Sequence, residues 1–152
     1  MRTSSVPPEA AHRLTIRQVF GALADERRWV CWRYETRNGK PTKVPIQPNG
    51  RRAKSDDPQT WTALSRCVTY AEATPGVGVG IVFNGDGLVG IDLDDCIDPS
   101  TGELAEWAEQ VVADHASYTE KTPSGRGLHI LCRGTLPGGA TGTKRGKIEV
   151  YA

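Results

Sequence analysis

The chain has 152 residues, of which 38% are hydrophobic and 24% charged, and its formal net charge at pH 7 is +1. A chain of this size most simply forms one domain with a true core. The sequence has no apolar run of the roughly 20 residues needed to cross a bilayer, and its first residues, MRTSSVPPEAAHR, lack the apolar segment of a secretory signal. We therefore expect no membrane association and a cytoplasmic location.

The cysteines argue against the common metal and disulfide frameworks. Their separations of 36, 29 and 36 residues leave no CxxC pair, and the three histidines do not complete a zinc pattern. A disulfide scaffold is not expected in a chain without an export signal. We expect free thiols at the four positions, Cys31, Cys67, Cys96 and Cys132.

The small net charge hides a segregation along the chain. Residues 1–60 hold 12 Lys and Arg against 6 Asp and Glu, residues 61–120 hold 1 against 11, and residues 121–152 hold 6 against 1. Folding could place an acidic centre between basic flanks, which suits a metal-binding centre beside a polyanion. An ordinary acidic surface helix is the alternative, and residues 103–109 supply part of the excess.

The first half of the chain predicts a tail, a hairpin and a helix. Residues 1–13 are polar and proline-bearing, as in a disordered tail, and a short helical pattern follows over 16–23. Strands over 29–34 and 42–46 flank Asn38-Gly39, a strong turn signal. After a basic loop, we expect one helix capped by Asp57, with Pro58 at its first position, running to about Ala73.

The second half alternates predicted strands with one helix. A strand over 76–83 and a second one over 88–94 read as a hairpin around the turn NGDG. Helical spacing of apolar residues covers 102–115. Strands are expected over 117–121, 128–133 and 147–152, and the glycine-rich stretch 134–146 reads as flexible.

These elements predict an α+β fold with a mixed or antiparallel sheet and flanking helices. Because a strand runs to the last residue, we expect a fragment of a longer protein, truncated at its C-terminus. The expected domain spans 14–152.

The stretch GLVGIDLDDCID carries four aspartates directly behind an apolar run. On a strand, Asp92 and Asp94 share one face with Cα atoms roughly 7 Å apart, and two such carboxylates favour Mg²⁺ or Mn²⁺. A solvated strand edge is the alternative. Asp95 and Asp98 fit strand-end and turn roles, and a calcium loop is excluded because Ile97 stands where glycine is required.

Two later elements complete a candidate site. The loop TPSGRG, with Ser124 and Arg126, has backbone amides that could face a phosphate, and His129 follows on the next strand. Glu149 lies between Ile148 and Val150 and faces away from both, as a further metal ligand would. A structural histidine and a surface glutamate remain the alternatives.

The order of these elements resembles the three-motif signature of the archaeo-eukaryotic primase superfamily: hydrophobic-Asp-x-Asp, small-x-His, hydrophobic-acid. The blocks at Asp92-Leu93-Asp94, Gly127-Leu128-His129 and Ile148-Glu149 fill it in order. Residues 27–151 also resemble the bifunctional primase-polymerase domain of phage and plasmid replication proteins. The resemblance implies an RRM-like catalytic core. Glycine at 127 in place of serine removes a hydroxyl from the second motif.

The resemblance also implies an activity, a DNA primase or DNA-directed DNA polymerase that uses two divalent ions, Mg²⁺ or Mn²⁺. Asp92, Asp94 and Glu149 would bind the ions, and His129 would contact the phosphates of the incoming nucleotide, helped by Ser124 and Arg126. The implied partners are a single-stranded DNA template and (d)NTPs. A replicative helicase module is a further expected partner, because mobile-element members often carry one downstream.

The basic N-terminal segment offers charge for a polyanion. We expect nucleotide binding by Lys43, and nucleic-acid binding by Lys40, Arg51 and Lys54. Trp29, Trp32 and Tyr34 could stack on bases, although alternating aromatics in a hairpin more often belong to a core. Two rival functions stay open: a catalytically inactive module that binds single-stranded DNA or nucleotides, and a metal-dependent nuclease.

Overall fold

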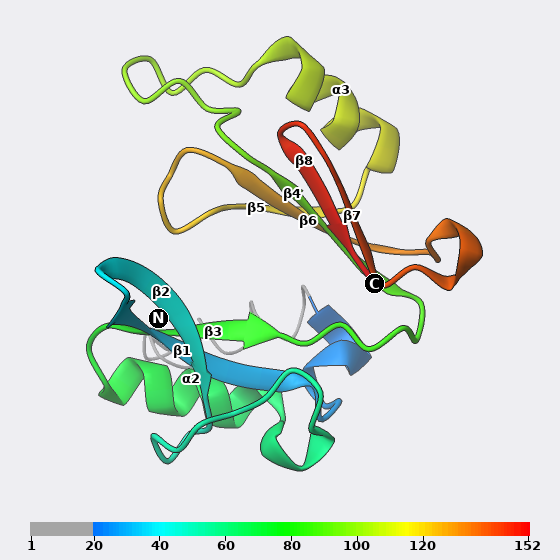
Figure 1. The fold of residues 1–152 in the computed structure, drawn as a ribbon. Helices are drawn as coiled ribbons and strands as arrows, with labels where there is room; N and C mark the ends of the chain where they lie inside the picture. Colours follow the sequence, from blue (N-terminus) through cyan, green and yellow to red (C-terminus); the bar gives the residue numbers. More distant parts are fainter. Residues whose placement is uncertain (1–19) are drawn as a thin grey trace, which may run out of the picture. The chain divides into compact units, whose positions relative to one another are not determined.

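The structure is a computed structural model that describes residues 20–152, so the predicted tail and the first half of the helical pattern over 16–23 lie outside the described part. The chain divides into two compact units, the first ending at Val82 and the second spanning Phe83–Ala152. Each is described by itself (Figure 1). Within the described residues, no helix combines the length and the apolar character needed to cross a membrane.

The first unit is a three-stranded antiparallel sheet in the order β2-β1-β3. Its strands are β1 (Trp29–Arg37), β2 (Lys40–Ile46) and β3 (Val77–Ile81). The predicted hairpin is confirmed, because Asn38 and Gly39 both have the positive φ, 50° and 74°, that a tight hairpin turn requires. Helix α2 (Leu64–Ala73) covers one face, where Cys67 packs in the same buried cluster as Cys31.

The single helix predicted from Asp57 to about Ala73 is wrong in its first half. Asp57 does cap a turn, accepting a hydrogen bond from the Gln59 amide at 3.1 Å, but this turn is a short 3-10 helix, η2 (Pro58–Thr60). The chain then extends, because Thr62 exchanges two backbone hydrogen bonds with Trp29. The buried Trp61 ring also donates to the Lys54 carbonyl at 2.7 Å. Another 3-10 turn, η1 (Gly21–Ala24), precedes β1.

The second unit is a five-stranded sheet in the order β5-β6-β4-β8-β7, with every neighbouring pair antiparallel. The strands are β4 (Leu88–Leu93), β5 (Tyr118–Lys121), β6 (Leu128–Arg133), β7 (Gly142–Arg145) and β8 (Ile148–Tyr151). Helix α3 (Glu106–His115) lies over one face (Figure 1). The predicted α+β class is confirmed, and both described sheets are antiparallel rather than mixed.

Two predictions about the strands fail, one about their pairing and one about their number. The strands on either side of NGDG do not form a hairpin, because β3 pairs with β1 in the first sheet and β4 lies between β6 and β8 in the second. The stretch 134–146, read as flexible, contains the short helix η3 (Pro137–Gly139) and the edge strand β7. All four residues of β7 are exposed. Because its sequence, GTKR, has no alternation of apolar and polar residues, it carries no signal that would mark a strand.

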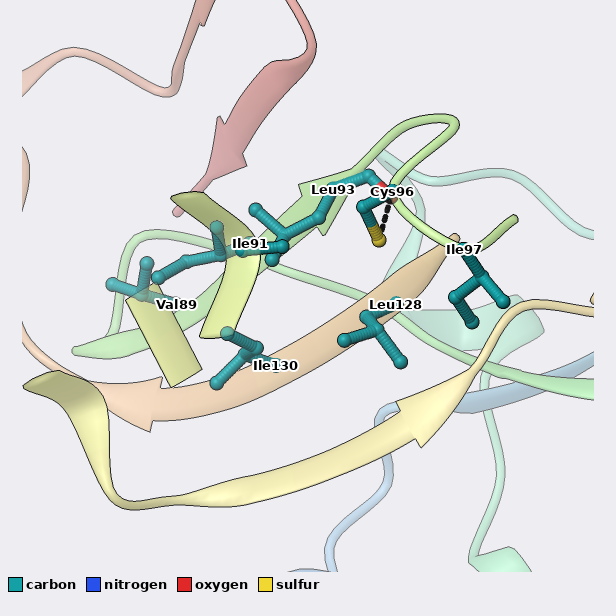
Figure 2. Packing of buried hydrophobic residues seen from close by; sticks show 8 residues of the cluster. Val89, Ile91, Leu93, Cys96, Ile97, Leu128 and Ile130 are labelled. Atoms are coloured by element: carbon teal, nitrogen blue, oxygen red, sulfur yellow. Dashed lines mark hydrogen bonds between the residues drawn. The ribbon is translucent and has the colours of Figure 1, made fainter. Parts of the chain in front are cut away.

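The core of the second unit fixes which side chains face away from it. Val89, Ile91 and Leu93 point to the helix-covered face and pack with Leu128 and Ile130 of β6 (Figure 2). Side chains alternate along a strand, so the residues between them face the opposite side of the sheet. The expectation of free thiols is also confirmed at all four cysteines.

Candidate functional site

A row of five polar side chains crosses the second sheet from one edge to the other. Asp92 in β4 stands opposite His129 in β6 on one side and opposite Glu149 in β8 on the other. Glu120 in β5 stands opposite His129, and Lys144 in β7 stands opposite Glu149. Each strand therefore contributes one member, in the order Glu120, His129, Asp92, Glu149, Lys144. The antiparallel register brings together residues separated by up to 57 positions in the sequence, as between Asp92 and Glu149.

Asp92 is the central and most confined member of the row. Its side chain is 25% exposed, and its Oδ1 is a buried oxygen without a hydrogen-bond partner among the described residues. Burial raises the pKa of this carboxyl above its ordinary value. The His129 ring opposes that shift, and the carboxylates of Asp94 and Glu149 add to it. A buried carboxylate oxygen without a hydrogen-bond partner, amid other acids, is a group that a cation would satisfy.

His129 is held between two carboxylates. Its Nε2 lies 3.6 Å from Asp92 Oδ1, and its Nδ1 lies 3.4 Å from Glu120 Oε1. Glu120 is itself fixed, because the Tyr118 hydroxyl donates to its Oε2 at 2.6 Å. This chain of contacts, from Tyr118 through Glu120 to His129, orients the imidazole beside the central aspartate.

Asp94 follows directly after β4, where its amide donates to the Lys147 carbonyl at 2.8 Å. Its carboxylate is bound by Lys144, whose Nζ lies 3.2 Å from Asp94 Oδ2 and 3.0 Å from Glu149 Oε2. A lysine ammonium thus bridges two of the three predicted metal ligands. These two carboxylates raise the pKa of Lys144.

The two remaining aspartates of the stretch occupy turn positions, as the sequence indicates. Asp95 has a positive φ of 45°. Asp98 accepts hydrogen bonds from the amides of Ser100 and Thr101, at 2.7 and 3.2 Å. The hydroxyl and amide of Ser100 and the amide of Thr101 lower the pKa of the Asp98 carboxyl.

The loop before β6 is closed by its own hydrogen bonds. The amides of Gly125 and Gly127 donate to the carbonyl and hydroxyl oxygens of Thr122, at 2.8 and 3.1 Å. The Ser124 hydroxyl lies 2.9 Å from that of Thr122, and the Arg126 guanidinium pairs with Asp95 at 3.0 Å. Phosphate binding by these amides, Ser124 and Arg126 stays a prediction, and it would require some of these bonds to open.

Glycine at position 127 has a steric cause. A Cβ built there would meet the Leu93 carbonyl oxygen at 2.6 Å, closer than real Cβ atoms come to backbone. The departure from serine in the second motif therefore matches the close approach of this loop to the end of β4. The small residue lets the loop and the acidic strand lie side by side.

The predicted basic residues lie in the first unit. Lys43 stands opposite Tyr34 in the hairpin, and its Nζ lies 4.7 Å from the centroid of the Trp32 ring. Trp29 is core, whereas the Tyr34 side chain is 53% exposed and meets Trp32 edge to face. The other three predicted DNA-binding residues are exposed, at the start of β2 and in the following loop: Lys40, Arg51 and Lys54.

Two members of the row were not predicted from the sequence. Glu120 lies in YTEK, where a single acid on a short strand carries no distinctive spacing, although its alternation with Tyr118 could have placed both on one face. Lys144 lies in the stretch read as flexible. Its role could not be inferred without knowing that β7 pairs with β8.

The donor set fits a divalent cation, although the ligands do not converge on one point. No group of three His, Cys, Asp or Glu side chains within residues 20–152 forms a ready-made metal site. The chemistry is nevertheless appropriate: three neighbouring carboxylates, a buried oxygen on Asp92 that has no hydrogen-bond partner, and a lysine ammonium that already bridges Asp94 and Glu149. Oxygen ligands of this kind suit Mg²⁺ and Mn²⁺.

The fold and the row define an α+β domain that presents acids and a histidine from one face of an antiparallel sheet. Comparison of the sequence with known proteins identifies the family of this domain. The profile described as bifunctional DNA primase/polymerase, N-terminal, matches residues 14–151, and the chain belongs to that family. The resemblance drawn from the motifs is thereby confirmed.

One relative shows the scale of the likeness. Over 118 residues the chain is 37% identical to the DNA primase-polymerase of Nitratiruptor phage NrS-1. The match covers 76% of this chain and 16% of the phage protein, so the chain spans a small part of that relative's length.

Proposed function

We propose that residues 14–152 form a catalytic domain for template-directed nucleotidyl transfer, joining nucleotides on single-stranded DNA as a DNA primase and polymerase. The setting would be replication of a phage, plasmid or similar mobile element. The observation that carries the proposal is the register that places Asp92 between His129 and Glu149. Membership of the primase-polymerase family supports the same activity.

Asp92, Asp94 and Glu149 would hold two divalent ions, Mg²⁺ or Mn²⁺. The bound ions would lower the pKa of the attacking 3′-hydroxyl and neutralise charge on the departing pyrophosphate. The protein's task is to hold these carboxylates on one rigid sheet face, with the adjacent strands β4 and β8 fixing the spacing of Asp92 and Glu149. Positioning and charge neutralisation then supply most of the rate.

His129 would contact the phosphates of the incoming nucleotide. Its Nδ1 faces Glu120, so the imidazole has a fixed orientation and presents its Nε2 side toward Asp92. A phosphate near the ions would replace Asp92 as the partner of Nε2. Ser124 and Arg126, in the loop that leads into β6, would add contacts to the same phosphates.

The first unit would contribute the polyanion-binding surface. Lys43 would bind the nucleotide, and Lys40, Arg51 and Lys54 would bind the template by charge. These three side chains are exposed and lie within 15 positions of each other in the sequence. Their contribution should therefore depend steeply on salt.

The experiment is a primer-synthesis and extension assay with the purified chain, single-stranded DNA, nucleotides and Mn²⁺, and with Asp92→Ala as the comparison. Synthesis by the natural chain, lost in the variant, is the expected result. Synthesis that survives Asp92→Ala would remove the metal role. Binding of DNA without synthesis would indicate the non-catalytic module instead, and cleavage of labelled DNA without nucleotides would indicate a nuclease.

A further inference from the structure

The candidate metal site contains a cationic side chain, the ammonium of Lys144. Lys144 Nζ lies within 3.2 Å of one carboxylate oxygen of Asp94 and within 3.0 Å of one of Glu149. The placement follows from the backbone, because Lys144 and Glu149 are directly opposed in the β7–β8 hairpin. Asp94 is brought to the same place by its amide bond to the Lys147 carbonyl in the turn of that hairpin.

Of the two lysines in the β7–β8 hairpin, only Lys144 contacts carboxylates. Lys147 is three residues away, and its Nζ donates to the backbone carbonyl of Asp95 at 3.3 Å rather than to a carboxylate. Lys144 alone of these two has two acidic side chains as partners. Two neighbouring carboxylates repel each other unless a positive charge lies between them, and here the ammonium supplies that charge.

We propose that Lys144 is a resident counter-cation that competes with divalent ions for Asp94 and Glu149. The inference rests on the metal site of the proposed function and specifies how that site is held before metal binds. Ligation by both carboxylates requires the ammonium to leave. Metal binding is therefore an exchange of one cation for another, and the natural chain binds divalent ions more weakly than the bare acids would.

The exchange is feasible because Lys144 is easily displaced. Its side chain is 52% exposed on an edge strand, and exposed ion pairs of this kind are individually weak. A divalent ion brings twice the charge and accepts several oxygen ligands at once. The ammonium thus holds the acids near one another until a divalent ion displaces it.

The test is a titration of the purified chain with Mn²⁺ alone, following the free ion by electron paramagnetic resonance, without DNA or nucleotide. Lys144→Met removes the charge and keeps most of the side-chain length. Lys147→Met is the matched control in the same hairpin. We expect Lys144→Met to bind Mn²⁺ about three- to tenfold more tightly than the natural chain, where tenfold corresponds to about 1.4 kcal/mol. Lys147→Met should bind as the natural chain does.

The outcomes separate this inference from the proposed function. Equal affinity in all three proteins, or weaker binding by Lys144→Met, would overturn the competition while leaving the metal site intact. Failure of every protein to bind Mn²⁺ would overturn both. Circular dichroism of each variant shows that the comparison is made between folded proteins. A second readout is the melting temperature in EDTA, which Lys144→Met should lower and added Mn²⁺ should restore.

Discussion

The two units share the same construction but present different side chains. Within the described residues of each unit, an antiparallel sheet has one face against an α-helix, α2 in the first and α3 in the second, and that face carries the core. The opposite face differs. In the first it presents Trp32, Tyr34 and Lys43, and in the second it presents the row centred on Asp92. The helix-covered face builds the fold, and the other face presents the side chains to which we assign binding.

Charge follows the same division. Residues 20–82 hold 10 Lys and Arg against 6 Asp and Glu, whereas residues 83–152 hold 6 against 11. A basic surface with an exposed aromatic suits a polyanion with stacking bases, and an acidic row suits metal cations. The comparison implies that changes in one unit should affect one kind of binding and spare the other.

The largest expected effect is on catalysis by the second unit. Glu149→Gln removes one predicted ligand charge while keeping the shape of the side chain and its place in β8. We expect nucleotide incorporation to fall at least about 100-fold, the scale of losing one charge-stabilising group at an active site. Binding of single-stranded DNA, measured by fluorescence anisotropy, should stay within about twofold of the natural chain. A parallel loss of DNA binding would mean that the two units do not divide the tasks.

The next effect is on stability, and it contrasts a glycine from each unit. At Gly127 an added Cβ meets the backbone carbonyl of Leu93 at 2.6 Å, and at Gly78 it meets the side chain of Trp32 at 2.3 Å. Backbone within a central strand cannot move as a side chain can. We expect Gly127→Ala to lower the free energy of unfolding by about 2–3 kcal/mol, as overpacking does. Gly78→Ala should cost less, because Trp32 can turn away.

Denaturant unfolding followed by circular dichroism measures both changes, and Trp fluorescence of Gly78→Ala reports the displaced ring. Equal losses for the two variants would show that the first sheet resists the shift of Trp32 as firmly as the second resists a shift of its backbone.

Several parts of this arrangement could be predicted from the sequence because they depend on local rules. The Asn38-Gly39 hairpin follows from two residues that tolerate positive φ. Strand alternation turns the Asp92 side chain to the face of the sheet away from Ile91 and Leu93. The order of three short motifs was sufficient to indicate the family. The roles of the individual site residues stay predictions.

What could not be predicted depends on long-range pairing. The NGDG turn looks like a hairpin, yet its two strands belong to different sheets, and local sequence carries no information about that choice. The break at Thr62 arises from backbone bonds to a strand more than 30 residues earlier. Lys144 and Glu120 acquire their partners only through strand register, so composition could not identify them.

A third prediction tests the first unit. Replacing Lys40, Arg51 and Lys54 together with Gln removes three exposed positive charges without touching the core. If all three contact phosphates, affinity for single-stranded DNA should fall about tenfold. The slope of log affinity against log salt should then become shallower by about 2, at roughly 0.7 per contact on a single strand.

Anisotropy titrations from low to moderate salt measure this slope, and Lys121→Gln, which removes one exposed positive charge from the second unit, is the control. Mn²⁺ binding should be unchanged in the triple variant. An unchanged salt slope would show that the polyanion surface lies elsewhere.

The smallest expected effect concerns the stability cost of the acidic row. Asp92 has a raised pKa, chiefly because it is buried, so the folded state holds its proton to higher pH than the unfolded state does. Below the ordinary value of 3.8 both states are protonated and nothing is lost. As pH rises above that value, the unfolded chain ionises first, and stability falls until the folded carboxyl also ionises. The penalty then persists at neutral pH.

Asp92→Asn removes that penalty. In metal-free buffer we expect it to raise stability at pH 7 by about 1 kcal/mol, or roughly 2–4 °C in melting temperature, and to lose the advantage below about pH 4. Asp95→Asn, at an exposed turn position paired with Arg126, is the matched control and should give no gain. A variant no more stable than the natural chain at neutral pH would mean that contacts within the row already compensate the buried charge. The acid at the centre of the second unit's row would then cost that unit no stability.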